Sequence, residues 1–566
     1  MEYLQNVKKW REYKDLDASL KSELESLDRE KLEDAFYTDL AFGTGGMRGV
    51  MGVGTNRMNI YTIQKATYGF YLYMNEEYED LKERGVVISY DCRNNSFEFA
   101  KRSAMVLGAN GVKTYLFSSL RPTPELSFAV RHLGCCGGIM VTASHNPTEY
   151  NGYKVYDHLG CQLVPELADK AIARINGIED LFQVPLRDFD ELVSEGLVVM
   201  IDKEVDEAYL EQVKTVKFQE VDKKNIKIVF TPLHGTASVS LVDLLTEVGY
   251  NVIPVKEQMI PDGNFTTVAS PNPENASAFE KALELGKKEK ADILIATDPD
   301  ADRMGIAAID PKTGEYVLLT GNQTGAILLD YLAKFRKHEK TANVYNTIVS
   351  SNIAAAICAK HNLNLVQTLT GFKFIGEQAM LIENTDQEFF FGYEESYGYV
   401  IKDFVRDKDS LQATLLLSEV ASYYKSLNKT LVEVLDDIYA EYGYYAEGVE
   451  NIYLTGLDGS KKIEKIMRTF QGMRISEIAV RKVTIIEDYD QGIKYENNKK
   501  SRLTLPKSFV LKYIFEDGGW FVLRPSGTEP KLKMYFGVVG SSQFNAVDKA
   551  KAMEDSFIEL FFQEEK

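Results

Sequence analysis

Short apolar stretches alternate with helical patterns along most of this chain, and few folds accommodate that alternation. In the first series, apolar stretches at residues 86–90, 112–117 and 138–142 flank helical patterns at 97–107 and 124–133. Continuous apolar strands that alternate with helices are typical of parallel sheets covered by helices on both faces. This part of the chain is therefore expected to form a doubly wound α/β domain.

The same series recurs twice. Strands are expected at residues 226–230, 252–255, 293–296, 344–349, 363–367 and 389–391, with helices at 241–248, 278–285, 353–359 and 372–381. Beyond residue 448 the pattern changes to short strands at 483–486, 509–515, 520–523 and 532–536, with a helix at 543–562. Asp517-Gly518-Gly519 predicts a hairpin turn between two of these strands, whereas Lys499 to Arg502 is interpreted as a solvated loop.

These patterns predict an α/β fold of three doubly wound domains with mixed or parallel sheets, followed by a C-terminal α+β domain, around a central cleft. The expected division is a helical arm at 1–40, α/β domains at 41–205, 206–318 and 319–447, and an α+β domain at 448–566. A chain of 566 residues is too long for one hydrophobic core, and 45% hydrophobic residues are enough to build several.

Charge and cysteine content exclude several classes of protein. The formal net charge of −19 argues against a protein that binds nucleic-acid backbones. Five cysteines without a Cys-x-x-Cys pair predict neither a disulfide framework nor a cysteine zinc site. Neither a membrane-spanning stretch nor a signal peptide is recognised, so we expect a cytoplasmic protein without nucleic-acid or membrane partners.

Three aspartates follow one of the expected strands in the segment Asp298-Pro299-Asp300-Ala301-Asp302-Arg303. Alternate residues of an extended loop point the same way, so the three carboxylates can converge on one hard cation. An acidic surface turn is the alternative, but a triple aspartate directly after a buried strand fits it poorly. An open coordination position would suit Mg²⁺ shared with a phosphate oxygen.

A serine follows another expected strand in Thr142-Ala143-Ser144-His145-Asn146-Pro147. Ser144 is a candidate nucleophile, although adjacent residues such as Ser144 and His145 are not expected to face each other. A Ser/Asn-rich turn stopped by Pro147 explains the segment equally well.

Two further segments are suited to anions. Residues 524–531, Arg-Pro-Ser-Gly-Thr-Glu-Pro-Lys, combine a guanidinium, hydroxyls, a glycine and a lysine, which a dianionic phosphate requires. Residues 43–49 are glycine-rich and contain Arg48, but their glycine spacing is not that of a dinucleotide fingerprint.

Taken in order, these segments resemble the α-D-phosphohexomutase superfamily, in its long phosphoglucomutase/phosphopentomutase-like subgroup. The resemblance runs from about Phe42 to Tyr535. Its four signatures are the serine loop followed by Asn151-Gly152-Tyr153-Lys154, the aspartate loop, Gly392-Tyr393-Glu394-Glu395-Ser396, and Arg524-Pro525-Ser526-Gly527-Thr528.

The resemblance implies that Ser144 carries a phosphoryl group and that Mg²⁺ is held by Asp298, Asp300, Asp302 and a phosphoserine oxygen. It implies catalytic roles for Lys154 and Arg48 and a sugar 1,6-bisphosphate intermediate that also serves as activator. The implied substrate-binding residues are Arg303, Thr370, Lys373, Glu394, Ser396 and Lys408, and the implied phosphate-binding residues are Arg524, Ser526, Gly527, Thr528 and Lys531.

The implied reaction interconverts α-D-glucose 1-phosphate and glucose 6-phosphate, with a small phosphosugar as the partner and a monomeric or homodimeric protein. A phosphopentomutase acting on ribose or deoxyribose phosphates is one alternative, because the long subgroup also contains phosphopentomutases and Gly392-Tyr393 departs from the Cys-Gly that precedes Glu-Glu-Ser in the glucose-specific animal pattern. An aspartyl-phosphate phosphatase with Asp298 as nucleophile is another, and a non-catalytic phosphosugar-binding protein is a third.

Overall fold

The computed structural model describes residues 3–43, 45–454, 459–473, 475–478, 481–497, 499–526 and 531–563. The chain divides into two compact units. The first contains residues 1–321 and 372–430, and the second contains residues 322–371 and 431–566.

The chain begins with the helical arm that the sequence predicts. Asp17 and Asp28 accept hydrogen bonds from the first turns of its second and third helices. Trp10 is 1% exposed and meets the rings of Phe36 and Tyr61 edge-on, with centroids 5.6 and 5.5 Å away. The arm is therefore anchored on α4, where Tyr61 lies; the helices are α1 (Tyr3–Glu12), α2 (Ala18–Ser26), α3 (Arg29–Phe36) and α4 (Ile60–Glu77).

The first sheet has the strand order β1-β2-β6-β5-β3-β4-β7. Its β3, β4, β5 and β7 are parallel, whereas β6 is antiparallel to both β5 and β2. The sheet is therefore mixed, which is one of the two arrangements, mixed or parallel, that the sequence predicts. The strands are β1 (Phe42–Gly43), β2 (Gly46–Val50), β3 (Val86–Tyr90), β4 (Thr114–Phe117), β5 (Gly137–Val141), β6 (Tyr150–Tyr156) and β7 (Val198–Ile201).

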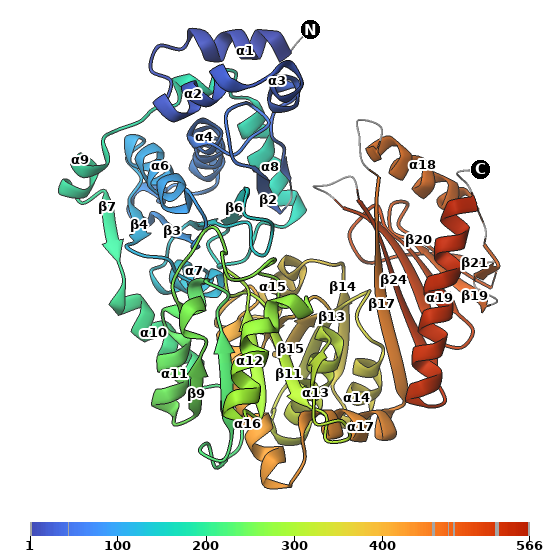
Figure 1. Ribbon diagram of the computed structural model, residues 1–566. Helices are drawn as coiled ribbons and strands as arrows, with labels where there is room; N and C mark the ends of the chain where they lie inside the picture. The colour runs from blue at the N-terminus through green and yellow to red at the C-terminus, as the bar shows by residue number, and fades with distance from the viewer. Residues whose placement is uncertain are drawn as a thin grey trace. The chain divides into compact units, whose positions relative to one another are not determined.

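Helices cover this sheet on two faces (Figure 1). One core cluster joins Phe70 of α4, Leu107 of α6 and Ala168 of α8 to Ile88 and Ile139 of the sheet. Helix α7 packs on β3 and β5 from the other face. The helices of this part and the following connection are α5 (Leu81–Arg84), α6 (Ser96–Ala109), α7 (Thr123–His132), α8 (Pro165–Asn176), α9 (Phe189–Ser194) and α10 (Lys203–Lys214).

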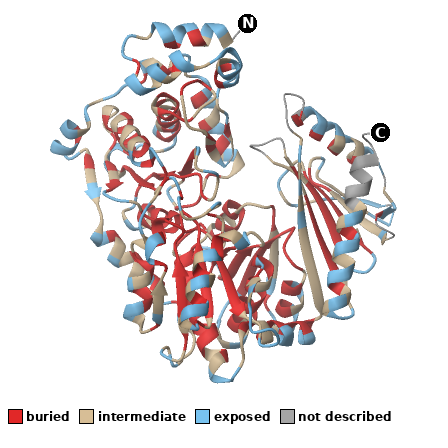
Figure 2. Cartoon of the chain, in the orientation of Figure 1, coloured by how far each residue is buried: buried red, intermediate tan, exposed pale blue. Residues whose placement is uncertain are grey.

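The second sheet has the order β12-β11-β10-β8-β9, in which β9, β8 and β10 are parallel and β11 and β12 are antiparallel. Strand β10 is buried along its whole length, and β11 is buried in all but its last residue (Figure 2). The elements are β8 (Lys227–Thr231), α11 (Leu241–Val248), β9 (Asn251–Pro254), α12 (Glu280–Glu289), β10 (Ile293–Thr297), β11 (Met304–Ile309) and β12 (Tyr316–Leu319).

The first unit ends with a helix, a hairpin and a long buried helix. Strands β15 and β16 pair antiparallel, with Glu394 opposite Gly398. Asp409 accepts hydrogen bonds from the backbone of Leu411 and Gln412 and thereby begins the last helix. The elements are α15 (Phe372–Leu381), β15 (Gln387–Glu394), β16 (Gly398–Val400) and α16 (Ser410–Ser426).

The second unit contains a parallel strand pair and the predicted C-terminal α+β region. The first part comprises α13 (Gly321–Phe335), β13 (Thr341–Thr347), α14 (Ile353–His361), β14 (Asn364–Thr368) and α17 (Leu431–Tyr442). The second comprises β17 (Tyr444–Tyr453), α18 (Gly459–Gly472), β18 (Glu477–Ile478), β19 (Arg481–Asp488), β20 (Ile493–Glu496), β21 (Lys499–Arg502), β22 (Leu511–Phe515), β23 (Trp520–Pro525), β24 (Lys531–Gly540) and α19 (Gln543–Gln563).

One local prediction in this region is wrong. Lys499–Arg502 is not a solvated loop but the strand β21, which pairs antiparallel with β20. All four side chains are exposed, so hydrophobic alternation could not reveal the strand. Charged side chains of this kind protect the outer edge of a sheet from further pairing. The predicted hairpin at Asp517-Gly518-Gly519 is confirmed, because it connects the antiparallel strands β22 and β23.

In the part of the chain that the structure describes, no helix combines the length and apolar character that crossing a bilayer requires.

Candidate active site

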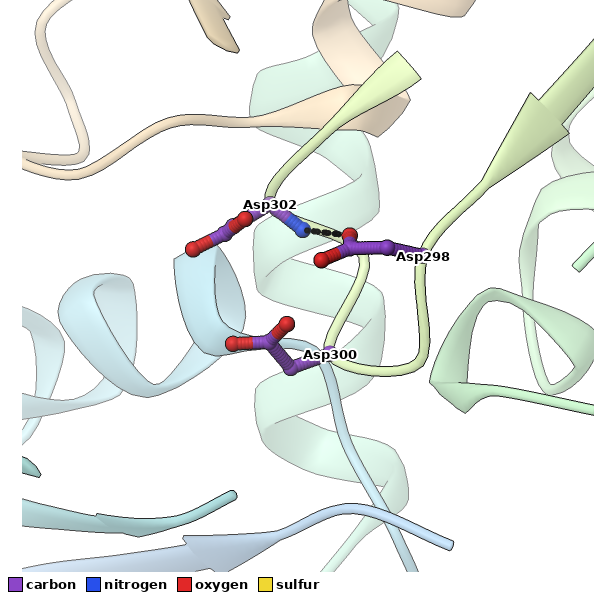
Figure 3. Close-up of side chains that lie close together, drawn as sticks. All are labelled: Asp298, Asp300 and Asp302. Atoms are coloured by element: carbon purple, nitrogen blue, oxygen red, sulfur yellow. Dashed lines mark hydrogen bonds between the residues drawn. The ribbon is translucent and has the colours of Figure 1, made fainter. Parts of the chain in front are cut away.

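The three aspartates of the loop between β10 and β11 converge, as their spacing predicts (Figure 3). One oxygen of each carboxylate lies within 4.8 Å of the others, and the residues are at most 2% exposed. The backbone N–H groups of Asp302 and Arg303 donate to Asp298 Oδ1 at 3.1 and 3.0 Å, which folds the loop around that side chain. Ala301 adopts a left-handed conformation, φ +53°, at the turn between Asp300 and Asp302.

Two carboxylate oxygens of this cluster lack a hydrogen-bond partner among the described residues, namely Asp300 Oδ1 and Asp302 Oδ1. Both are buried, and a buried carboxylate oxygen without a partner is costly. Asp302 Oδ1 has Arg303 Nε at 3.8 Å, which is beyond hydrogen-bond distance. Hard oxygen ligands with unsatisfied lone pairs fit a hard divalent cation. The cluster can therefore hold a metal ion.

Two lysines contact the same cluster from neighbouring segments. Lys154 Nζ, on β6, lies 2.8 Å from Asp300 Oδ2 and 3.3 Å from Asp302 Oδ2. Lys408 Nζ, just before α16, lies 3.2 Å from Asp302 Oδ2 and 3.1 Å from Asp407 Oδ1. Burial opposes the charged form of both lysines, but the adjacent aspartates raise the pKa of each above its ordinary value. Both are therefore cations at neutral pH.

The pKa values of the aspartates differ within the cluster. Burial and the charges of Asp300 and Asp302 raise the pKa of Asp298 well above its usual range. Burial also acts to raise the pKa of Asp302, but the charges of Lys408 and Lys154 outweigh burial and hold that pKa below its usual value. Asp298 is thus the carboxylate with least cationic compensation.

Ser144 lies against Asp298. The serine follows β5, and its Oγ donates to Asp298 Oδ2 at 2.6 Å. Ser144 is 4% exposed and has a left-handed backbone, φ +50°, which costs energy for a residue with a side chain. Strained backbone at a buried serine is more common at functional sites than in ordinary turns, so a plain Ser/Asn turn explains the segment less well.

Ser144 also contacts its neighbour His145, contrary to expectation. The Oγ atom lies 3.1 Å from His145 Nδ1. Burial, together with the charges of Arg303 and Arg48, lowers the pKa of His145 well below its ordinary value. The imidazole is therefore neutral at pH 7.

Arg93 holds the serine loop and was not predicted. Its guanidinium donates to the carbonyl oxygen of Ser144 at 2.6 Å, to those of Pro147 and Tyr150 at 2.9 and 3.1 Å, and to that of Asn146. Arg93 belongs to the polar segment Asp91-Cys92-Arg93-Asn94-Asn95, which follows the strand β3. Its position after a parallel strand was the signal that could have identified it.

Thr123 was also missed. It begins α7 and donates from Oγ1 to Asp300 Oδ2 at 2.9 Å, while its backbone N–H donates to the carbonyl of Asp300 at 2.9 Å. The first domain and the aspartate loop are joined by these bonds.

The remaining predicted residues of the first unit lie on elements around this cluster. Arg48, on β2, is opposite Gly152 of β6 and donates to Asn146 Oδ1 at 2.8 Å. Arg303 pairs with Glu274. Glu394, the last residue of β15, is 4% exposed, and its charge contributes to the raised pKa values of Lys408 and Arg303.

Lys373 lies in the first turn of α15 and is 9% exposed, and half-buried Ser396 follows Glu394 in the turn before β16. Their predicted roles rest on the resemblance.

The predicted phosphate-binding residues lie in the second unit. Arg524 is on β23 opposite Lys533, and the backbone N–H of Ser526 donates to the carbonyl of Lys531 at 2.7 Å. This hairpin brings Arg524, Ser526 and Lys531 to one end of the sheet. Gly527 and Thr528 are outside the described residues. Thr370 is half-buried and also belongs to the second unit.

Models of the phosphoglucomutase/phosphomannomutase family match four successive parts of the chain. The α/β/α domains I, II and III match residues 39–181, 207–310 and 320–442, and the C-terminal domain matches residues 487–552. The chain belongs to this family.

Curated relatives agree over nearly the whole length. A phosphoglucomutase of Staphylococcus epidermidis is 39% identical over 512 residues, which are 89% of this chain and 92% of the relative. A phosphoglucomutase of Staphylococcus aureus is 38% identical over 523 residues, 92% and 93% of the two chains.

Solved structures share the fold at lower identity. Parafusin, a phosphoglucomutase from Paramecium, superposes with a TM-score of 0.69 at 18% identity and covers 93% of this chain and 96% of its own. A family member from Burkholderia thailandensis gives a TM-score of 0.65 at 17% identity, and the match covers 92% of this chain and 97% of that protein. At these identities the likeness establishes the fold alone.

Proposed function

We propose that this chain is a phosphotransferase that interconverts α-D-glucose 1-phosphate and glucose 6-phosphate. The phosphoryl group of phosphorylated Ser144 is transferred to the free hydroxyl of the bound sugar phosphate, which gives glucose 1,6-bisphosphate. The Oγ–P bond breaks and a sugar O–P bond forms, while in net terms the proton of the sugar hydroxyl is transferred to Ser144 Oγ, which becomes a free hydroxyl. After the bisphosphate reorients, its other phosphoryl group returns to Ser144 Oγ. Relatives named phosphoglucomutase at 38–39% identity support this assignment.

The observation that carries the proposal is the contact between Ser144 Oγ and Asp298 Oδ2 at 2.6 Å within a cluster of three buried carboxylates. A phosphoryl group on Oγ would bring its oxygens beside that cluster. In the proposed enzyme Asp298, Asp300 and Asp302 hold Mg²⁺, which when bound neutralises charge on the phosphoryl oxygens. A phosphoserine oxygen is the proposed fourth ligand.

The chain's own residues supply positioning and positive charge, on which phosphoryl transfer mainly depends. Arg93 fixes the backbone of Ser144 through its carbonyl oxygen. Lys154 is the proposed general acid–base group, because its Nζ lies at the aspartate cluster that Ser144 contacts. As a cation it would first supply the proton that Ser144 Oγ gains when the phosphoryl group leaves, and would then accept the proton of the sugar hydroxyl. Arg48 is proposed to stabilise charge at the serine loop, where it donates to Asn146.

Substrate recognition is proposed for residues in both units. In the first unit Glu394 and Ser396 are proposed to bind sugar hydroxyls, and Arg303, Lys373 and Lys408 to contact the phosphosugar. In the second unit Thr370 is a further substrate contact. The phosphate that does not react is assigned to Arg524, Ser526, Gly527, Thr528 and Lys531.

The test compares kcat/KM for glucose 1-phosphate and ribose 1-phosphate, with Mg²⁺ and the matching bisphosphate. We expect a ratio that strongly favours glucose. A ratio that favours ribose would reassign the substrate to a pentose phosphate and leave the Ser144 step intact.

The covalent step is tested separately with the phosphorylated protein. Phosphate on Ser144 should resist hydroxylamine and be located at Ser144 by mass spectrometry of the digest. Release of the phosphate by hydroxylamine would instead indicate an acyl phosphate on Asp298 and overturn the mutase mechanism.

A further inference from the structure

A cavity of about 280 Å³ lies in the first unit, away from the aspartate cluster. It is bordered by α4, by the segment that joins β6 to α8, and by α15; we call it the α15 cavity. Its volume is near the lower end of ordinary small-molecule pockets, about 300–1,000 Å³. Nothing in the proposed mechanism uses it.

The hydroxyl of Tyr73 is a polar group in this cavity that lacks a protein partner. Tyr73 is only 3% exposed, lines the cavity, and makes no hydrogen bond to any residue that the structure describes. Tyr156, another buried tyrosine of this unit, is by contrast paired with Asp407 at 2.8 Å. The hydroxyl is therefore available to form a hydrogen bond with an occupant of the cavity.

The carboxylate of Glu377, on α15, is likewise unpaired among the described residues. Glu77 of the same wall pairs with Lys170 at 2.8 Å, and Asp157 accepts the backbone N–H groups of Leu159 and Cys161 at 2.9 and 3.0 Å. Burial, and then repulsion from Glu166, raises the pKa of Glu377. A positive charge in the cavity would relieve both effects.

Apolar groups complete the wall. The cavity is lined by the rings of Tyr73 and Tyr78 and by Leu167 and Met380. Aromatic faces next to carboxylates are the surroundings in which proteins hold organic ammonium ions. We propose that the α15 cavity binds a small organic cation, an ammonium group on an apolar body, with Glu377 as its counter-charge and the Tyr73 hydroxyl as a hydrogen-bond partner.

The cavity is connected to the proposed substrate site through α15. Cys161, on the cavity wall, donates from Sγ to the carbonyl oxygen of Lys373 at 3.4 Å. Lys373 and Glu377 are one helical turn apart on α15. An occupant of the cavity would therefore press on the helix that carries Lys373.

The test measures binding of benzylammonium to the full chain by ligand-observed NMR, with benzyl alcohol as the neutral probe of similar shape. For a ligand this small we expect a Kd of about 1 mM, with the alcohol at least about fivefold weaker. Glu377→Gln keeps the shape and removes the charge, and should weaken benzylammonium binding about fivefold. Tyr73→Phe should weaken both probes.

Glu79→Gln is the matched control, since Glu79 is exposed at the end of the same wall and does not line the cavity. It should leave the affinity unchanged, and thermal melting of each variant checks the fold. No binding to the unmodified chain, equal affinity for the alcohol, or an equal loss in both glutamate variants would overturn the proposal. The readout is binding, so it does not depend on the proposed mutase activity.

Discussion

Replacement of Asp300 by Asn should weaken divalent-metal binding and leave the fold in place. The variant keeps the shape of the side chain but removes one of the three charges that converge within 4.8 Å. It also changes a side chain whose Oδ1, like that of Asp302, has no partner among the described residues and is available to a cation. Loss of one interaction with a charged group is worth about 1.5–3 kcal/mol, which corresponds to a Kd about 10- to 150-fold higher.

The assay is calorimetric titration of the dephosphorylated chain with Mn²⁺ and with Mg²⁺. Asp169→Asn is the control, because Asp169 is an exposed aspartate of α8 outside the cluster. Because Asp300 Oδ2 also accepts hydrogen bonds from Lys154 and Thr123, the substitution can alter the stability of the fold as well as metal binding. Melting curves should therefore accompany each titration. If Asp300→Asn bound Mn²⁺ as tightly as the unmodified chain does, the aspartate cluster would not be the metal site.

Three other changes have definite expected outcomes. Ser144→Ala should remove phosphate incorporation and reduce kcat at least about a thousandfold. Ser144→Gly should also lose activity, but it should melt at a higher temperature than the alanine variant, because glycine adopts φ +50° without strain. Arg524→Ala should lower kcat/KM, and an unchanged kcat/KM would contradict its assignment to the phosphate. Gly376→Ala should destabilise by about 1–3 kcal/mol, because its Cβ would lie 2.5 Å from the Arg406 carbonyl oxygen; Gly472→Ala, with nothing within 4 Å, should not lower the melting temperature.

Strands buried on both faces could be predicted from the sequence. Strand β6, which carries Lys154 of the site, could not. The expected strand at 86–90 is β3, and the expected stretch at 138–142 is β5 within one residue. Strand β6, with the sequence Tyr-Asn-Gly-Tyr-Lys-Val-Tyr, has no apolar run, although six of its seven residues are buried. Its polar groups are buried because they serve the site, as Lys154 does between two aspartates.

The aspartate cluster was predictable because its geometry is local. Alternation along one short loop suffices to bring Asp298, Asp300 and Asp302 together. The contact of Ser144 with His145 was not expected, because adjacent side chains of a chain rarely face each other. Arg93 was missed because its partners are four carbonyl groups, which are present in every sequence and carry no pattern.

The two lysines at the aspartate cluster have a consequence for how the protein responds when divalent metal is withdrawn. Lys154 and Lys408 lie within 3.3 Å of carboxylate oxygens of Asp300 and Asp302, so much of the acidic charge is compensated by the chain itself. Folding of the chain should therefore not require a bound ion, unlike the folding of proteins whose metal is part of the folded core. Removal of the ion by a chelator should abolish the activity of such an enzyme without unfolding it. Readdition of the ion should restore the activity within the time of mixing.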